Sequence, residues 1–423
     1  MRKLVAGRFR QQVGTTFFAH IMSAFFAIIN AAVVARVLGV EGKGILSLLL
    51  LVPNMLGLFL GCGIGVANIY YTGSKRWDVA TLVRNSIGMT ILMSGVGIIG
   101  VIGAMISGLL PIVLPNVPLL LVFVALIGFP LNLLSSYLAT ILQGLQRIFT
   151  LNALSVMQSV ITLVLNLVLV VGFNTGIIGA LSASLLAMTV NLGIIVFLLR
   201  QAGARFRPAW NLAVMRSTLS YGLRGYIGNV LQFFNYRLDL FIVNYFLGAA
   251  GTGIYSVSVA LAELLWYLPN AVGFVIFPKA AASKPEMMNR FTPRVFGITL
   301  ALTLLGGLGL AVIGRPFIGI VYSTDFLPAY VPLLVLLPGV ILLGSAKVLT
   351  NEIAGRGYPH YNSINSGLAL IVTIGLDLLL IPRYGVLGAS MASSIAYTLI
   401  FFTAIGFYYM VSRRTAGEQS VES

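Results

Sequence analysis

The chain has 423 residues, of which 59% are hydrophobic and 9% are charged, and its mean hydropathy is +1.01. Soluble proteins average about 45–50% apolar and about 25% charged residues, so this composition excludes a water-soluble enzyme and an intrinsically disordered chain. The apolar runs are long enough to be α-helices that cross a bilayer. A polytopic membrane protein is the class that remains.

The net charge of +16 indicates orientation in a membrane, because basic residues collect on cytoplasmic loops. Nucleic-acid binding is not expected, since no basic patch is interleaved with aromatic residues. The single cysteine, Cys62, excludes an internal disulfide and a cysteine-based metal site, and no metal is expected. A basic start leads into a full-length apolar segment, which predicts an uncleaved first helix.

The hydropathy pattern predicts an all-α integral membrane protein with twelve transmembrane helices. Each helix needs about 20 apolar residues to cross a hydrocarbon core about 30 Å thick. The expected spans are 14–35, 45–68, 86–110, 118–142, 151–173, 177–199, 219–246, 252–278, 295–314, 331–353, 362–381 and 387–411. The segments between them are too short to form an extramembranous domain.

The basic residues support this number of helices. If the N-terminus is cytoplasmic, 19 Lys and Arg residues fall on the inner side and four fall on the outer side. Such a bias sets the orientation of a membrane protein, so both termini are predicted to be cytoplasmic. The basic residues within spans are Arg224, Arg237 and Lys347.

Two sequence patterns recur at a spacing of 209 residues. Leu38-Gly39 with Gly42 and Gly44 returns as Leu247-Gly248 with Gly251 and Gly253. The pattern that opens the sixth helix at Gly176 returns at Gly385 before the twelfth. Because this spacing covers six helices, an even number, both halves enter the membrane from the same side. The sequence predicts two parallel six-helix lobes, 1–210 and 211–423.

Parallel repeats of this kind occur in transporters that bind substrate between their halves. An ancient duplication with structural meaning only is the alternative. The glycines after the first and seventh helices are expected to adopt positive φ in tight turns. Mid-span prolines are also expected to correspond, Pro53 with Pro269 and Pro130 with Pro338, as matching bends.

Polar residues recur at the same spacing on the first and seventh helices. The first helix carries His20, Ser23 and Asn30. The seventh carries Asn229, Gln232 and Asp239, each 209 residues later. Arg224 and Asn235 extend the second stripe to an arc of roughly 140°. Such a face does not suit lipid, so it is expected to face a water-filled cavity or the opposite half.

Charged residues within a membrane are costly, which makes them candidates for function. Arg237 lies outside the arc, and two readings are open: an ion pair, with Glu263 as one candidate partner, or a second cation facing the cavity. Arg224 either faces the cavity or reaches the inner interface. Asp377 either binds a coupling cation or makes a polar contact. His20 either carries a proton or is a hydrogen-bonded structural residue.

These residues suggest an anionic substrate, because an arginine fork complements phosphate oxygens. Arg224, Arg237 and Lys347 are the candidate cations. Asp239, Glu263 and Asp377 are the candidate sites for a coupling ion. No tightly held cofactor is expected, and Na⁺ and H⁺ are the two coupling ions considered.

The chain resembles the polysaccharide-export or O-antigen-type flippases of the multidrug/oligosaccharidyl-lipid/polysaccharide superfamily. The segments that carry the resemblance are Ala35–Gly39, Asn235–Asp239, Leu247–Gly248 and Ile381–Gly385. Gln143-Gly144 also fits, echoed by Ala354-Gly355. The lipid II flippases of that superfamily usually have fourteen helices, whereas this chain has room for twelve.

The resemblance implies a V-shaped transporter like the multidrug exporters of the superfamily, acting by alternating access. It implies that polyprenyl-pyrophosphate-linked oligosaccharide units are moved across the bacterial inner membrane, for polymers such as lipopolysaccharide. Membrane lipid and polysaccharide polymerase or assembly proteins are the implied partners, and a monomer is expected.

Two other functions are alternatives for a chain of this composition. A cation-coupled exporter of small organic molecules with the same fold is the alternative, although cavity arginines favour an anion. A membrane-embedded glycosyltransferase or ligase needs acidic pairs or a large outer loop. No Asp-x-Asp or Glu-x-Asp motif occurs in the sequence, so we do not expect an enzyme.

Overall fold

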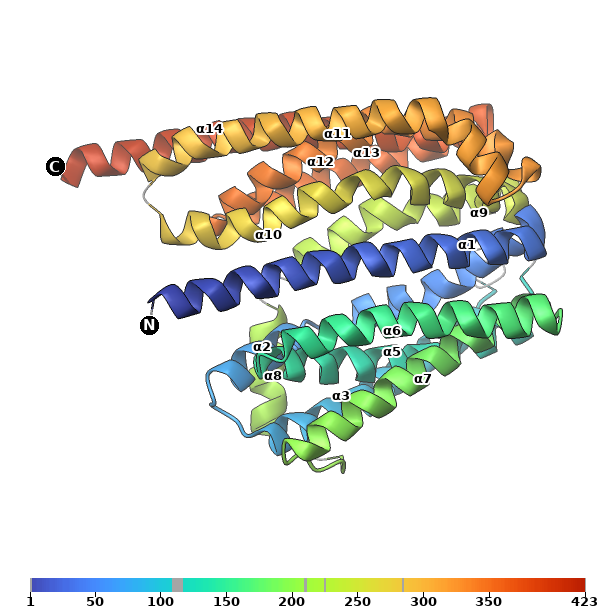
Figure 1. Cartoon of the computed structure of the whole chain (residues 1–423), viewed down its shortest axis with the longest axis horizontal. Coiled ribbons are helices and arrows are strands. Elements are labelled where there is room, and N and C mark those ends of the chain that lie inside the picture. Colours follow the sequence, from blue (N-terminus) through green and yellow to red (C-terminus); the bar gives the residue numbers. More distant parts are fainter. Residues whose placement is uncertain (1, 109–116, 209–210, 224–225, 284, 423) are drawn as a thin grey trace. The chain divides into compact units, whose positions relative to one another are not determined.

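The computed structural model describes residues 2–108, 117–208, 211–223, 226–283 and 285–422 (Figure 1). Within these ranges the structure is helical and contains no strand. The α-helices of the first half are α1 (Arg2–Leu60), α2 (Ile64–Gly73), α3 (Val79–Ile106), α5 (Leu119–Gly144), α6 (Ile148–Asn166), α7 (Gly176–Gln201) and α8 (Leu212–Leu223). Those of the second half are α9 (Tyr226–Glu263), α10 (Tyr267–Ala282), α11 (Pro285–Val321), α12 (Tyr330–Gly355), α13 (His360–Tyr384) and α14 (Val386–Glu422).

Shorter helices extend or connect these elements. The π-helix η1 (Leu167–Gly172) continues α6, and the 3₁₀-helix η2 (Leu264–Trp266) joins α9 to α10. A second 3₁₀-helix, η3 (Thr324–Ala329), precedes α12. The chain divides into two compact units, Met1–Tyr226 and Ile227–Ser423. Helix α8 packs on α2 and belongs to the first unit, although it follows the boundary drawn at 210 from the sequence.

The described residues contain ten helical stretches that are long and apolar enough to cross a membrane. The two longest, Phe18–Leu60 and Gly228–Phe277, contain 43 and 50 residues. Each is interrupted by a glycine with non-helical backbone angles, Gly39 or Gly248. Each part is still at least about 20 residues long, enough for one crossing. The ten stretches therefore hold twelve membrane-length segments, and the predicted all-α membrane fold is confirmed.

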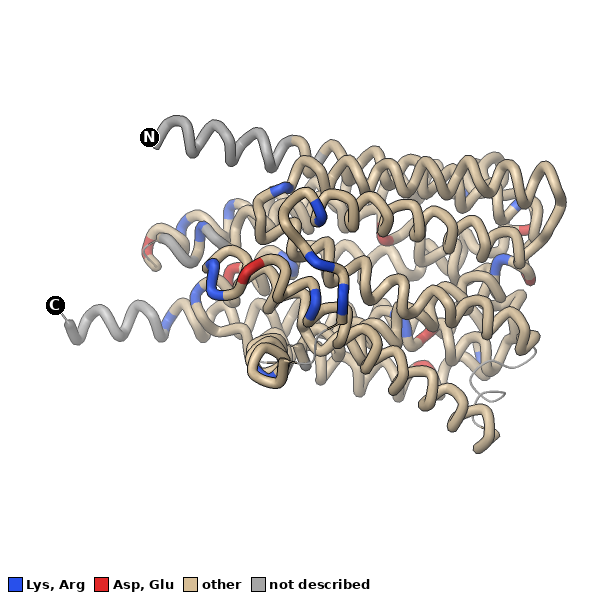
Figure 2. Tube along the Cα trace, turned by 90° about the horizontal axis from the view of Figure 1, so that it is seen from below, with Lys and Arg blue, Asp and Glu red and all other residues tan. Residues whose placement is uncertain are grey.

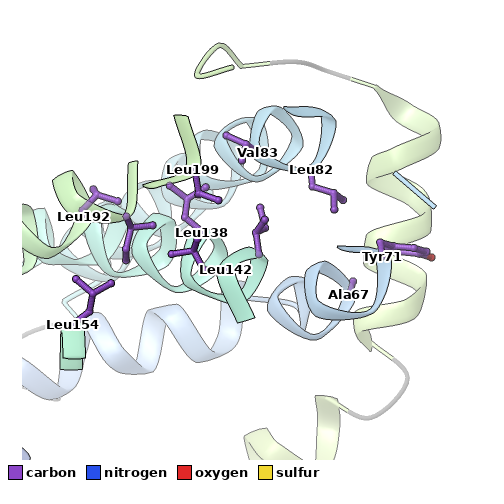
Figure 3. Packing of buried hydrophobic residues seen from close by; sticks show 11 residues of the cluster. Ala67, Tyr71, Leu82, Val83, Leu138, Leu142, Leu154, Leu192 and Leu199 are labelled. Carbon is purple, nitrogen blue, oxygen red and sulfur yellow. The ribbon is translucent and has the colours of Figure 1, made fainter. Parts of the chain in front are cut away.

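Charged residues are sparse along these helices (Figure 2). A leucine-rich core binds α2, α3, α5, α6 and α7 of the first unit together, with Leu82, Val83, Leu138 and Leu199 buried at its centre (Figure 3). In the second unit Ile276, Met288 and Val348 form a smaller core among α10, α11 and α12. Close packing of such side chains stabilises helices in a membrane, where water exclusion contributes little between them.

The predicted second span, 45–68, is interrupted in the structure. Helix α1 ends at Leu60 and α2 begins at Ile64, with Cys62 at φ 49° and Gly63 at φ 66° between them. A Cβ atom on Gly63 would lie 2.2 Å from the carbonyl oxygen of Gly222. The break therefore lets the backbone after α1 approach α8 directly, which hydropathy does not reveal.

The predicted seventh span, 219–246, is also interrupted. Helix α8 ends at Leu223 and α9 begins at Tyr226. Arg224 falls between them and lies outside the described residues. The first residues of this predicted span, 219–223, thus belong to the separate short helix α8.

The sequence repeat is also a repeat of backbone geometry. Gly39 has φ 68° and ψ −174°, and Gly248, 209 residues later, has φ 69° and ψ −171°. Gly176 and Gly385 also have positive φ, 63° and 59°. These angles are easily adopted only by glycine, and the predicted positive φ of the glycines after the first and seventh helices is confirmed.

Helix packing follows the same repeat. Gly128 of α5 faces Leu185 of α7, and Gly339 of α12 faces Ser394 of α14. The first members of these pairs are 211 residues apart and the second members are 209 apart. Helices α5 and α12 therefore correspond at a spacing of 211, and α7 and α14 at a spacing of 209.

The helix boundaries agree with this register, because α5 and α12 begin 211 residues apart, at Leu119 and Tyr330. Pro130 and Pro338 are only 208 residues apart, about one helical turn out of register. The expectation that these two prolines correspond was therefore wrong. Each proline lies inside its own helix, at a different height within the repeat.

Candidate functional site

The second unit contains a partly exposed charged cluster, formed by Arg237, Glu263 and Lys347. The Arg237 guanidinium donates two hydrogen bonds to the Glu263 carboxylate, Nη1–Oε1 at 2.7 Å and Nη2–Oε2 at 2.9 Å. Both residues lie on α9, on opposite sides of the break at Gly248. The structure thus forms the ion pair that was one of the two readings of Arg237.

This ion pair is accessible. The Arg237 and Glu263 side chains retain 30% and 22% of their exposure. An exposed ion pair within a membrane-length segment is costly against lipid, so a watery or ligand-filled space is its favourable surrounding. A group that enters this space can compete with Glu263 for the arginine fork.

Lys347 of α12 brings a second cation to the cluster. Its Nζ atom donates a hydrogen bond of 3.0 Å to Asn270 Oδ1 and lies 4.0 Å from the Trp266 ring centroid. The ring of Tyr236 is 5.0 Å from that of Trp266, centroid to centroid. Cations are attracted to aromatic faces at such distances, so these rings hold the ammonium group in place. The cluster contains two cations and one anion, and it carries a net positive charge.

Two carboxylates of the same unit are buried, and one of them, Asp239, interacts electrostatically with Arg237 and Glu263 of the cluster. Asp239 is 2% exposed and Asp377 is fully buried, and the two side chains interact electrostatically. Asp239 Oδ2 accepts hydrogen bonds from Tyr255 Oη at 2.5 Å and from Ser393 Oγ at 3.3 Å. Its Oδ1 accepts the Leu240 N–H at 2.8 Å. Neither carboxylate oxygen of Asp377 has a hydrogen-bond partner among the described residues.

The first unit has a neutral counterpart of this carboxylate pair. Asn166 of α6 donates a hydrogen bond of 2.8 Å to Asn30 of α1. Asn30 precedes Asp239 by 209 residues, and Asn166 precedes Asp377 by 211. Equivalent positions therefore carry two hydrogen-bonded amides in the first unit and two electrostatically interacting carboxylates in the second. Two buried carboxylates repel each other unless one of them binds a proton or a cation lies nearby.

The other predicted site residues do not share one exposed face. Asn229, Gln232 and His20 are exposed, and Gln232 donates to Tyr236 Oη at 2.9 Å. Asn235 is buried and accepts a hydrogen bond of 2.8 Å from Thr373 of α13. Asn235 and Asp239 were expected to face a water-filled cavity or the opposite half, and in the structure they are buried and bond Thr373 of α13 and Ser393 of α14.

Several residues of the site were missed from the sequence. Trp266, Tyr236 and Asn270 surround Lys347, and Tyr255 and Ser393 hold Asp239. A signal existed for Tyr236, which adjoins Arg237 in the Asn-Tyr-Arg-Leu-Asp segment. For the others the only signal was a polar or aromatic residue in an apolar helix, which does not identify its neighbours.

Comparison with known proteins gives related sequences. The family model described as "Polysaccharide biosynthesis protein" matches residues 33–331. An uncharacterized membrane protein of Methanocaldococcus jannaschii is 22% identical over 68% of this chain and 59% of its own length. The probable flippase AglR of Haloferax volcanii is 25% identical over 43% of this chain and 40% of its own length. The chain thus matches less than two thirds of the length of these curated relatives.

Solved structures share the fold. The lipid II flippase MurJ, in an inward closed conformation, aligns with a TM-score of 0.77 and 14% identity over 95% of this chain and 90% of its own. An inward-facing multidrug resistance MATE family transporter of the MOP superfamily aligns with a TM-score of 0.75 and 15% identity, over 93% and 96% of the two chains. At these identities the likeness concerns the fold.

Proposed function

The chain belongs to the polysaccharide biosynthesis protein family, and from this premise we propose that it is a flippase for polyprenyl-pyrophosphate-linked oligosaccharides. In this proposal it moves the lipid-linked unit from the inner to the outer leaflet of the bacterial cytoplasmic membrane by alternating access, with both termini in the cytoplasm. The flippase named among its relatives and the transporter fold of the solved structures support this function over an enzymatic one.

The observation that carries the proposal is the charged cluster of Arg237, Glu263 and Lys347. A planar guanidinium matches two phosphate oxygens at once, as it matches the Glu263 carboxylate in the structure. Glu263 keeps Arg237 paired when no substrate is present, because an unpaired charge is unfavourable in a membrane. The pyrophosphate then takes the place of Glu263 on Arg237, and Lys347 supplies the second positive charge.

We assign ion coupling to the buried carboxylate pair. The Asn30–Asn166 hydrogen bond joins two neutral amides, whereas Asp239 and Asp377 are two buried acidic groups that interact electrostatically. Binding of Na⁺ or H⁺ relieves their repulsion, and release of the ion restores it. The free energy of an ion gradient is thereby linked to the packing of α9 against α13. Glu263, the third candidate, is engaged by Arg237, and its role is in the charged cluster.

Two further expectations belong to the proposal. The protein acts as a monomer in contact with membrane lipid, and polysaccharide polymerase or assembly proteins receive its product. The second candidate function is cation-coupled export of small organic cations. The fold of the MATE transporter and the Glu263 carboxylate beside aromatic rings favour that alternative.

A competition experiment separates the two functions. The purified protein is loaded with fluorescent polyprenyl pyrophosphate oligosaccharide and challenged with unlabelled polyprenyl pyrophosphate or with ethidium, a cationic dye. Displacement by the pyrophosphate lipid and not by ethidium is expected of the flippase. Displacement by ethidium alone, or binding of ethidium in place of the lipid, contradicts the proposal and favours the exporter.

A further inference from the structure

A polar pocket with no established role lies in the first unit, between α5, α6 and α7. Its volume is about 300 Å³, at the small end of the roughly 300–1,000 Å³ typical of ligand pockets. Its hydrogen-bonding side chains are Asn132, Ser135, Ser136, Ser155, Gln158 and Asn191. None of the described residues that line it is charged. The pocket therefore offers amide and hydroxyl groups within a membrane protein without offering a charge.

Hydrogen bonds between helices position the polar side chains of the pocket, and one buried oxygen atom among them has no hydrogen-bond partner among the described residues. The Asn191 amide donates to Gln158 Oε1, which fixes α7 against α6. Asn191 is 7% exposed, yet its Oδ1 atom has no hydrogen-bond partner among the described residues. A buried carbonyl oxygen without a partner is unfavourable. A ligand hydroxyl group can donate the hydrogen bond that Asn191 Oδ1 lacks.

Asn132 of α5 is positioned by a contact of its own. Its Nδ2 atom donates to Asn54 Oδ1 of α1 at 3.1 Å. On α6, Ser155 Oγ lies 3.3 Å from Ser23 Oγ of α1. Two polar groups of the pocket are therefore fixed by side-chain contacts to α1, so the site is largely preformed.

The repeat shows that packing does not require this polarity. In the register established above, Asn132 corresponds to Leu343, Ser135 to Ala346 and Asn191 to Ile400. The second unit builds the same helices with apolar side chains at these positions. Polar groups within a membrane are expensive, so the presence of these three polar side chains in the first repeat alone favours a function other than folding.

In the same register, two residues that line the pocket correspond to residues at the charged cluster. Ser136 of α5 corresponds to Lys347 of α12, and Met188 of α7 corresponds to Tyr397 of α14. Tyr397 packs against Trp266 at 5.9 Å between ring centroids, beside Lys347. At these two positions the second unit therefore has a cation and an aromatic ring where the first unit has neutral side chains.

We propose that the polar pocket binds a sugar residue of the substrate, an inference that rests on the proposed flippase function. Amides and hydroxyls both donate and accept hydrogen bonds, as sugar hydroxyls do. A neutral pocket of about 300 Å³ suits one hexose or N-acetylhexosamine residue. The pocket recognises the sugar by hydrogen bonds alone, because none of the described residues that line it is charged.

The test is a competition between two lipids observed by native mass spectrometry. Purified protein receives equal amounts of polyprenyl pyrophosphate and of polyprenyl-pyrophosphate-linked N-acetylglucosamine, with the glucose-linked lipid in a parallel sample. The wild type is expected to prefer a sugar-bearing lipid by about 10-fold. Asn191→Leu and Gln158→Met each remove hydrogen-bonding groups at similar volume. Each is expected to reduce the preference to about twofold while occupancy by the sugar-free lipid stays within about twofold of wild type.

Thr189→Val on α7 is the matched control, because Thr189 is exposed, lies outside the pocket and bonds only its own helix at Leu185. It is expected to keep the full preference. If both pocket variants bind the sugar-free lipid normally and keep the preference for the sugar, the pocket assignment is overturned and the flippase proposal stands. If the wild type binds neither lipid, the flippase proposal fails and the pocket assignment with it.

Discussion

Asp239 occupies in the second unit the position that Asn30 occupies in the first, and each is matched by a buried partner of its own kind. Asn30 accepts a hydrogen bond from Asn166, whereas Asp239 interacts with Asp377, whose oxygens have no hydrogen-bond partner among the described residues. Equivalent positions are thus neutral in the first unit and acidic in the second. We proposed ion coupling at the acidic pair on the basis of this difference.

Replacing Asp377 with asparagine converts the carboxylate pair toward the neutral pair of the first unit. Asp377→Asn is expected to leave the melting temperature unchanged or raised, because two like charges are no longer buried together. It is expected to reduce gradient-driven flipping in liposomes by at least about 10-fold, which is about 1.4 kcal/mol of activation free energy. Separate Na⁺ and pH gradients identify the coupling ion.

Asp325→Asn is the control, since Asp325 is exposed in η3, and flipping by this variant is expected to match wild type. Full activity of Asp377→Asn under both gradients would remove the carboxylate pair from the coupling mechanism.

The break at Gly248 is expected to be required for folding of the second unit. Its φ of 69° and ψ of −171° belong to a region used almost only by glycine, at a cost of roughly 1–3 kcal/mol for other residues. A Cβ atom there meets nothing within 4 Å, so the cost is one of backbone conformation. Gly248→Ala should therefore lower the melting temperature, and Gly39→Ala should do so by a similar amount.

Gly309→Ala provides the comparison for these variants. Gly309 lies within α11, has no positive φ and also has open space around its Cβ position. Alanine favours a helix by about 1 kcal/mol over glycine, so this variant should be neutral or stabilising. Equal effects of Gly309→Ala and Gly248→Ala would show that the backbone break is not the cause.

Gly63 and Gly222 allow the backbones after α1 and within α8 to touch. A Cβ atom on Gly63 would lie 2.2 Å from Gly222 O, which a flexible side chain cannot relieve. Gly63→Ala is expected to detach α8 from α2 and to increase proteolysis in the connection around residues 202–211. Gly73→Ala, where a Cβ meets nothing within 4 Å, should be cleaved at the wild-type rate. Unchanged proteolysis in both variants would contradict the close approach.

Cys62, beside this contact, offers a pH-dependent measurement. Burial raises the pKa of the Cys62 thiol, so less of the reactive thiolate is present at a given pH than in an exposed cysteine. Its reaction with a soluble maleimide is expected to be slow at pH 7 and to rise with pH over a higher range. The Cys62→Ala/Ser74→Cys variant, with an exposed cysteine, supplies the reference. Identical pH profiles of the two thiols would contradict this.

The sequence predicted the helices because hydrophobic length determines what crosses a bilayer. It also predicted the turns at Gly39 and Gly248, since glycines that recur at a fixed spacing between apolar helices are typical of turns with positive φ. It did not predict the break at Cys62, because the cause is a backbone contact with α8, a helix distant in sequence. The expected correspondence of Pro130 with Pro338 was wrong because prolines are common in membrane helices. Two prolines at a similar spacing therefore do not establish which residues of the two repeats are equivalent.

The candidate site was predicted only in part. A helical wheel placed Asp239 on a wet face, but helices α13 and α14 cover it, and a wheel of one helix contains no information about its neighbours. Arg237, outside the predicted stripe, lies in the accessible cluster because α9 breaks at Gly248 and brings Glu263 back to it. The polar pocket is formed by residues of α5, α6 and α7 together. The sequence of any one of these helices does not show that its polar residues line a pocket.

In the proposed mechanism, the charged cluster of Arg237, Glu263 and Lys347 binds the pyrophosphate of a lipid that the protein flips. The most direct measurement is leaflet movement of a fluorescent polyprenyl-pyrophosphate-linked oligosaccharide in liposomes, comparing wild type with Arg237→Gln, Lys347→Gln and the exposed control Arg290→Gln. We predict rapid movement by wild type and Arg290→Gln, and a loss of about 10-fold or more in the two cluster variants. Wild-type rates in Arg237→Gln and Lys347→Gln, or no movement by wild type, would contradict the claim.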